Sequence, residues 1–284
     1  MTHLAVPKTY KLYIGGKFPR SESGRVYEVT TAKGEFLANA AKASRKDARD
    51  AVSAARAAVS GWSGATGYNR GQVLYRVAEL LEGRRAQFVD ELTKVDGLTA
   101  AAADKQVDAA IDAWVWYAGW ADKYAQVAGN GNPVAGPFFN ISVPEPTGVV
   151  AVVAPKEQGL FGLVSVIAPV LVSGNTVVVV ASETSPLSAI SLSEVLATSD
   201  VPGGVVNVLT GSAAELAPWL ADHSDVNAVD LSGAGDLDWS DLQVKAAQTL
   251  KRVREPETGE VERSVERVTF FTETKTVWHT KALI

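Results

Sequence analysis

The chain has 284 residues with a formal net charge of -5; 46% of the residues are hydrophobic and 21% are charged. This composition fits a folded protein of about two domains, and its mildly acidic balance offers no basic surface for nucleic acid or an anionic membrane. The sequence contains no cysteine, which excludes disulfides, thiolate metal sites and thiol chemistry. The three histidines are far apart and none has a partner at metal-ligand spacing, so we expect no metal site.

Signals for secretion or membrane insertion are weak throughout the sequence. The N-terminus lacks the long apolar core of a secretory signal. The apolar stretch 160–181 is interrupted by Pro169 and Gly174, which predicts a buried helix followed by a strand rather than a membrane span. Asn140-Ile141-Ser142 matches a glycosylation sequon, which we interpret as a chance match. We expect a protein of the cytoplasm.

The first half of the chain begins with β-like runs and continues with helices. Glycine turns divide residues 11–41 into short runs, which predicts a meander of hairpins. Ser44 and Asp47 form a capping-box-like start for a helix. The predicted helices cover 44–62, 69–86 and 101–124. Four aromatic residues between 114 and 120 recur at helical spacing and are interpreted as packing residues rather than a ligand-stacking surface.

From residue 148 onward, apolar strands alternate with helices. The predicted strands are 148–154, 176–181, 205–209 and 226–231, and the predicted helices are 160–172, 186–198, 213–221 and 239–253. Such alternation argues for an α/β fold with a doubly wound parallel sheet. Sheets of this kind bind ligands at the carboxyl ends of their strands.

Candidate site residues therefore follow the four strands. They are Pro155, Lys156, Ser182, Glu183, Gly211, Ser232 and Gly233. The loop 233–235 is the nearest feature to a dinucleotide fingerprint, because glycine lets a backbone approach a pyrophosphate at a helix N-terminus. The sequence has Asp238 where the fingerprint has its third glycine, and a plain turn between strand and helix explains the loop nearly as well. Glu183 could hold ribose hydroxyls, or it could be a solvated glutamate at a helix start.

Several sequence blocks extend these observations to a known family. They lie at 12–17, 34–35, 44–62, 117–123, 145–150, 173–178, 182–189, 202–211 and 250–253. In this order the blocks resemble the aldehyde dehydrogenase superfamily along nearly the whole chain. The resemblance implies a Rossmann-like cofactor domain with an N-terminal β meander and helices, and a small antiparallel β oligomerisation arm. It also implies NAD or NADP as the cofactor, bound by the seven candidate site residues.

The resemblance is interrupted after residue 253, where the family continues into its catalytic domain. Here a charged segment follows, and 271–278 then resembles the family's C-terminal strand. The implied organisation is a cofactor-binding domain over 1–253 with an oligomerisation strand near 138–147, a connection at 254–267 that replaces the catalytic domain, and an oligomerisation arm at 268–284. With the missing domain go the family's cysteine nucleophile and glutamate base, so we predict no catalytic residue.

Departures also occur within the retained cofactor domain. Glu157 stands where the family has an asparagine that stabilises the oxyanion, and a carboxylate repels such a charge. The family's ribose-contacting lysine aligns with Val180, while Glu183 is retained. The family's Thr-Gly-Ser turn has become Ser232-Gly233-Ala234. Each lost polar contact costs about 1–3 kcal/mol, so binding of NAD or NADP is expected to be weakened or lost.

These features lead to a functional hypothesis with alternatives. The leading interpretation is a pseudoenzyme that acts as a structural or regulatory subunit of an aldehyde dehydrogenase assembly. Residues 268–280 suit a strand whose exposed edge seeks partners, in a hetero-oligomer with a full-length aldehyde dehydrogenase or in a homodimer. The alternatives are an active NAD(P)-dependent aldehyde oxidoreductase that uses a non-cysteine or partner-supplied nucleophile, and a dinucleotide-sensing module.

Overall fold

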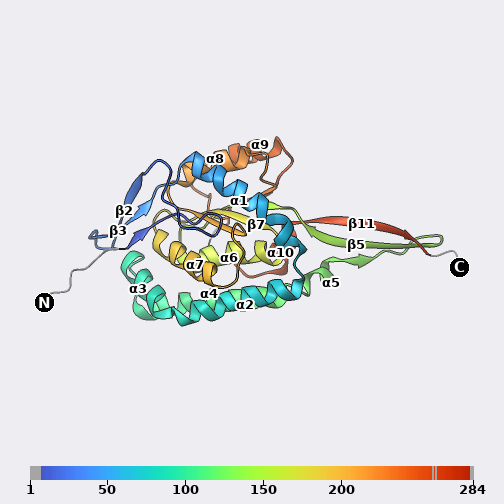
Figure 1. The fold of residues 1–284 in the computed structure, drawn as a ribbon, viewed down its shortest axis with the longest axis horizontal. Helices are drawn as coiled ribbons and strands as arrows, with labels where there is room; N and C mark the ends of the chain where they lie inside the picture. The colour runs from blue at the N-terminus through green and yellow to red at the C-terminus, as the bar shows by residue number, and fades with distance from the viewer. Residues whose placement is uncertain (1–7, 258, 260, 282–284) are drawn as a thin grey trace.

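The computed structural model describes residues 8–257, 259 and 261–281 of the chain (Figure 1). The helices are α1 (Arg45–Gly64), α2 (Gly67–Gly83), α3 (Arg85–Val95), α4 (Ala100–Trp120), α5 (Tyr124–Ala128), α6 (Gly159–Val172), α7 (Pro186–Thr198), α8 (Ala213–Asp222), α9 (Trp239–Ala247) and α10 (Val265–Phe270). The strands are β1 (Thr9–Tyr10), β2 (Val26–Thr30), β3 (Phe36–Ala41), β4 (Asn130–Gly131), β5 (Phe138–Pro146), β6 (Val149–Val153), β7 (Thr176–Val180), β8 (Val206–Leu209), β9 (Ala228–Asp230), β10 (Arg252–Arg254) and β11 (Thr272–Thr280).

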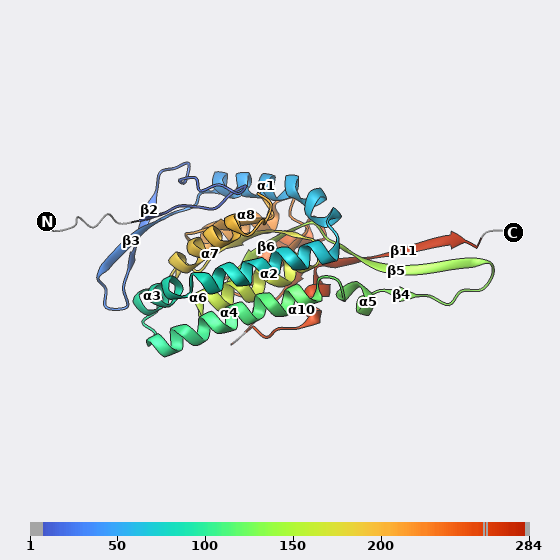
Figure 2. The ribbon, with the colours of Figure 1, turned by 60° about the horizontal axis from the view of Figure 1, so that its bottom comes forward.

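A five-stranded parallel sheet forms the centre of the molecule, in the order β10-β9-β6-β7-β8. Every residue of β6 and β7 is buried. Along β6, Val150 and Val152 belong to the core shared with α6 and α7, whereas Val149, Ala151 and Val153 belong to the core shared with α1 and α8. Helices therefore cover both faces of the sheet (Figures 1 and 2), which confirms the predicted doubly wound α/β fold.

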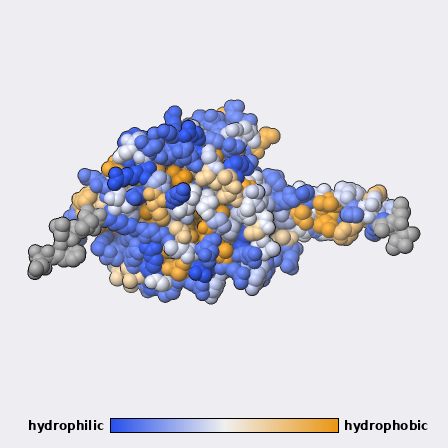
Figure 3. All heavy atoms as spheres, viewed as in Figure 1, coloured by the Kyte–Doolittle hydropathy of each residue, from blue (hydrophilic) through white to orange (hydrophobic). Residues whose placement is uncertain are grey.

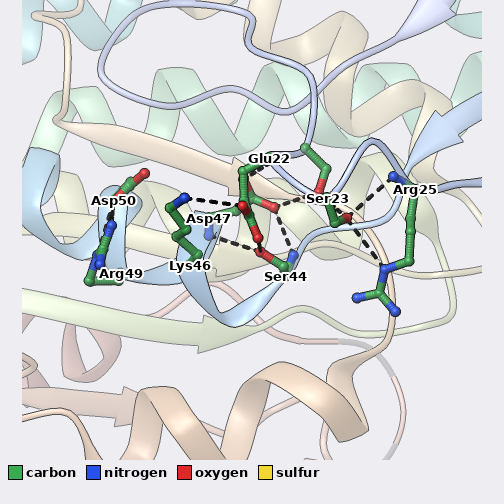
Figure 4. Close-up of polar contacts among 9 residues, drawn as sticks. Glu22, Ser23, Arg25, Ser44, Lys46, Asp47, Arg49 and Asp50 are labelled. Atoms are coloured by element: carbon green, nitrogen blue, oxygen red, sulfur yellow. Dashed lines mark hydrogen bonds and ion pairs between the residues drawn. The ribbon is translucent and has the colours of Figure 1, made fainter.

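The N-terminal segment packs beside this sheet as the predicted β structure followed by a capped helix. β3 pairs antiparallel with β2 but in parallel with β1, so the meander of hairpins predicted over 11–41 is reduced mainly to the β2–β3 hairpin. The Ser44 hydroxyl accepts a hydrogen bond from the Asp47 amide, and the Asp47 carboxylate accepts one from the Ser44 amide at 2.8 Å, which confirms the capping box. The same carboxylate accepts hydrogen bonds from Ser21 Oγ and the Glu22 amide, so it fastens the preceding loop to α1 (Figure 4).

The outer helices bury the aromatic residues that the sequence placed at helical spacing. Trp114 and Tyr117 of α4 are completely buried, and Trp116 and Trp120 are half-buried against the same core. α4 packs against α2 and α6. The interpretation of these residues as packing residues is confirmed. None of the helices in the described residues is long and apolar enough to cross a membrane, and the stretch 160–181 forms α6 followed by β7 as expected.

A three-stranded antiparallel arm, in the order β11-β5-β4, projects from the body (Figure 1). β11 pairs with β5 along its whole length, from Thr272 opposite Pro146 to Thr280 opposite Phe138. This arm confirms the antiparallel element implied by the resemblance. Asn140 of β5 is buried, and its side chain accepts a hydrogen bond from Asn132. The side chain of the sequon asparagine is therefore engaged within the fold.

Two predicted elements near the C-terminus were wrong in their boundaries. The helix expected over 239–253 ends at Ala247, because Leu250 takes a left-handed backbone conformation with φ 54° and the chain turns into β10. The strand expected from Val268 starts instead at Thr272. Ser264 caps a short helix, α10, and this helix buries Val268 in the core.

Candidate functional site

A cavity of about 530 Å³ lies where β6 and β9 end, at the carboxyl edge of the parallel sheet. The loop after β6 contributes Pro155 and Lys156, and the loop after β9 contributes Ser232 and Gly233. The connection that follows β10 forms another wall, through Glu257 and neighbouring residues. Four of the seven predicted site residues thus lie together in one cavity.

The other three predicted residues do not line this cavity. Ser182 follows β7, and its hydroxyl donates a hydrogen bond to the Lys156 carbonyl at 3.1 Å, which joins the two loops. Glu183 is exposed, and Gly211 is buried after β8 with φ 122°. Burial and then the Glu183 carboxylate raise the pKa of the Tyr27 phenol of β2. The Tyr27 hydroxyl has no hydrogen-bond partner among the described residues.

Gly233 is required by packing against the end of β6. A Cβ at this position would lie 2.0 Å from the Ala154 carbonyl oxygen and 2.6 Å from the Pro155 nitrogen. The Gly233 amide also donates to the Val153 carbonyl at 2.9 Å. The Ala154 oxygen and the Pro155 nitrogen belong to the backbone and cannot rotate away. Packing within the fold is therefore enough to explain why this residue is glycine, without a ligand.

The helix after this loop has its N-terminus occupied by a carboxylate. α9 begins at Trp239, several residues after Gly233, and the Asp238 side chain accepts a hydrogen bond from the Asp241 amide at 3.1 Å. A helix N-terminus attracts anions through its free amides and its dipole. Here the protein's own Asp238 already supplies that anion.

A buried polar network next to the cavity was missed in the sequence. Asp230 and Arg267 are 0% and 1% exposed, and Arg267 Nη2 lies 3.4 Å from Asp230 Oδ2. The same nitrogen donates to Ser232 Oγ at 3.2 Å, and Arg267 Nη1 donates to Glu257 at 2.5 Å. Ser232 Oγ in turn donates to Asp230 Oδ1 at 2.5 Å. One signal was available: Asp230 is an acidic residue in an otherwise apolar strand.

This network fastens the connection onto the edge of the sheet. Arg267 comes from α10, Glu257 from the segment after β10, and Asp230 from the end of β9. The Glu257 amide donates to the Ser232 carbonyl at 3.3 Å, and its carboxylate accepts from Arg254 as well. The residues expected to be a simple connection at 254–267 are thus tied by ion pairs to the strand ends that carry the candidate site.

The charged groups around the cavity are largely paired within the protein, since Glu257 accepts hydrogen bonds from Arg254 and Arg267. Among the described residues that line it, one lysine stands against three carboxylates, those of Glu157, Asp236 and Glu257. Lys156 pairs with Asp236 at 2.5 Å, and that pairing lowers the pKa of the Asp236 carboxyl. The cation is therefore already matched within the protein. Elsewhere in the described part of the chain, no three His, Asp or Glu side chains are grouped so as to hold a metal ion.

A parallel sheet wound with helices on both faces and a cavity at its carboxyl edge define a Rossmann-like α/β domain. The model of the aldehyde dehydrogenase family matches residues 18–259. The chain therefore belongs to the aldehyde dehydrogenase family.

Individual relatives support this assignment over one part of their length. The chain is 31% identical to cytosolic aldehyde dehydrogenase 1 of Elephantulus edwardii over 258 residues, which cover 89% of this chain and 51% of that protein. It is 31% identical over 256 residues to the cytosolic 10-formyltetrahydrofolate dehydrogenase of Pongo abelii, covering 86% of this chain and 28% of that one. The chain spans about half the length of the aldehyde dehydrogenase. It spans a smaller part of the 10-formyltetrahydrofolate dehydrogenase, which is a longer protein.

Solved structures agree with the sequence comparison. An NAD+ complex of an aldehyde dehydrogenase from Bacillus cereus superposes with a TM-score of 0.80 at 26% identity, covering 87% of this chain and 50% of that one. An NAD-dependent aldehyde dehydrogenase from Sinorhizobium meliloti gives the same values. The cofactor-domain fold expected from the resemblance is thereby confirmed.

Proposed function

We propose that this chain is a catalytically inactive member of the aldehyde dehydrogenase family that serves as a structural subunit of an assembly. The observation that supports the proposal is the network of Asp230, Arg267 and Glu257, in which the chain's own residues form ion pairs against the end of β9, beside the cavity.

The chemistry at the edge supports inactivity. Covalent aldehyde oxidation needs a nucleophile, a base and donors for the oxyanion held together. The described residues around the cavity include no cysteine and no histidine, and they include Glu157, the carboxylate that the resemblance aligns with the family's oxyanion-stabilising asparagine. A carboxylate accepts hydrogen bonds and opposes a developing negative charge.

The residues at the sheet edge fit a dinucleotide poorly. The Ser232 hydroxyl is engaged by Asp230 and Arg267, and Asp238 fills the N-terminus of α9. A pyrophosphate would have to compete with these internal contacts for the Ser232 hydroxyl and the helix N-terminus, which weakens its binding. On the adenosine side Glu183 is retained, but the family's ribose-contacting lysine is replaced by Val180. We therefore propose weak or absent binding of NAD and NADP.

Assembly is the role that remains, and the projecting arm is the element suited to it. β5 and β11 extend from the body with most of their side chains in solvent, including Phe139 and Trp278. Exposed apolar side chains gathered on one element are typical of an interaction site. As for the location of such a subunit, we propose the cytoplasm.

Turnover and cofactor affinity of the purified chain test the proposal. We expect no aldehyde-dependent formation of NADH or NADPH across a broad aldehyde panel, and calorimetric dissociation constants for NAD and NADP weaker than about 1 mM. The full-length Bacillus cereus enzyme, in the same buffers, is the positive control. Aldehyde-dependent NADH formation would contradict the proposal and favour an active oxidoreductase. Tight dinucleotide binding without turnover would contradict it in favour of a sensing module.

A further inference from the structure

Beneath the largely hydrophilic surface of the body (Figure 3), a buried carboxylate has an unpaired oxygen atom. Glu91 of α3 is 7% exposed. Its Oε1 accepts hydrogen bonds from Ser191 Oγ at 2.6 Å, from Gln87 Nε2 at 3.0 Å and from the Tyr10 hydroxyl at 3.3 Å. Its Oε2 is buried and has no hydrogen-bond partner among the residues that the structure describes. A buried acceptor without a donor is unfavourable, so it indicates a place where a ligand can supply the donor.

A cavity of about 260 Å³ lies beside Glu91, between β1, β3, α3 and α7. Lys8 and Lys94 also line it, and Leu37 and Leu187 give it apolar walls. Pockets for drug-sized ligands usually measure about 300–1,000 Å³. This cavity is smaller and combines a carboxylate with cations and apolar side chains, so it suits a small ligand that carries charges of both signs.

The Glu91 carboxylate has no ion-pair partner in the described part of the chain. The two lysines of the cavity pair with other groups: Lys8 Nζ with Glu194 and Lys94 Nζ with Asp90, both at 2.6 Å. The three groups that donate to Oε1 are a hydroxyl, an amide and a phenol, which carry no positive charge. An ammonium group that enters the cavity would therefore meet a carboxylate that no internal cation neutralises, and charge-assisted hydrogen bonds are the strong ones.

We propose that this cavity binds a small zwitterion, an α-amino acid with an apolar side chain. The ammonium group of the ligand donates to Glu91 Oε2, and its carboxylate is held by Lys8 and Lys94. Each lysine ammonium has three donors, so it can contact the ligand and keep its present partner. The apolar side chain of the ligand lies against Leu37 and Leu187. Neither an amine nor a carboxylic acid alone matches both the carboxylate and the lysines of the cavity.

Three probes of similar shape test the class of ligand. Leucine carries both charges, isoamylamine carries only the ammonium group, and isocaproate carries only the carboxylate. We expect leucine to raise the unfolding temperature of the purified chain with increasing concentration, and calorimetry to give one site per chain. Isoamylamine and isocaproate should bind at least about tenfold more weakly, because each lacks one charge-assisted contact. Equal affinity for either single-charge probe would overturn the proposal, as would a lack of binding by leucine, valine and methionine.

The Glu91→Gln variant tests the carboxylate. Its amide keeps the Oε1 acceptor but places a donor where the ligand ammonium would bind, so the affinity for leucine should fall at least about tenfold. Since Oε2 makes no hydrogen bond to the described residues, the unfolding temperature without ligand should change little. Glu79→Gln is the matched control, because Glu79 is an exposed glutamate of α2 that does not line the cavity. This control should bind leucine as the natural chain does.

A second variant tests the proposal even if Glu91→Gln does not fold. The Lys94 side chain is 49% exposed, so Lys94→Gln should fold normally and should weaken leucine binding about two- to fivefold. If leucine binds both variants as tightly as it binds the natural chain, the ligand lies elsewhere and the proposal is wrong. These measurements involve neither a dinucleotide nor an aldehyde, so failure of this proposal is distinct from failure of the proposed inactivity.

Discussion

Replacing Asp230 by alanine is expected to lower the free energy of unfolding by about 3–5 kcal/mol. The substitution leaves the Arg267 guanidinium buried at 1% exposure without its fully buried counter-ion. Only the half-buried Glu257 and the Ser232 hydroxyl would remain beside it. A buried charge that loses its partner is costly because water cannot replace the lost interaction. Urea denaturation of the purified variant measures the change.

A double substitution shows whether the unpaired charge is the cause. Asp230→Ala combined with Arg267→Met removes both charges and keeps an apolar side chain of similar length, so part of the lost stability should return. Lys156→Ala is the control for an exposed pair and should change stability little, since Lys156 and Asp236 are 50% and 73% exposed. If Asp230→Ala is as mild as Lys156→Ala, the network does not hold the connection on the sheet.

Gly233→Ala is expected to destabilise the protein by about 3 kcal/mol. The new methyl group would lie 2.0 Å from the Ala154 carbonyl oxygen and 2.3 Å from its carbon. These atoms belong to the backbone at the end of β6, so relief requires a shift of the sheet or of the loop. Thermal unfolding followed by circular dichroism measures the loss.

Gly235→Ala provides the matched control in the same loop. A Cβ at Gly235 would meet nothing within 4 Å, so its unfolding temperature should stay close to that of the natural chain. This pair distinguishes two explanations of the glycines. Equal and small effects at both positions would show that Gly233 is not needed for packing, and would restore ligand approach as the explanation for the glycine.

Local sequence rules predicted some elements of this fold correctly but misplaced the boundaries of others. The capping box at Ser44 and the buried strands β6 and β7 follow local rules of periodicity and capping, and both are found as predicted. The end of α9 and the start of β11 were misplaced. Their boundaries depend on a left-handed residue, Leu250, and on the burial of Val268, and neither is encoded in the local pattern of apolar residues.

By itself, the sequence determined the family, the alternation of strands and helices, and the absence of a thiol nucleophile. These follow from local patterns and from residue identity, which need no contacts between distant segments. Only the tertiary structure decided how the carboxyl edge of the sheet is closed. Asp230 and Arg267 are 37 positions apart, and nothing in their local sequences pairs them. The long-range packing of α10 brings them together, because a buried carboxylate and a buried guanidinium are stable only when they meet.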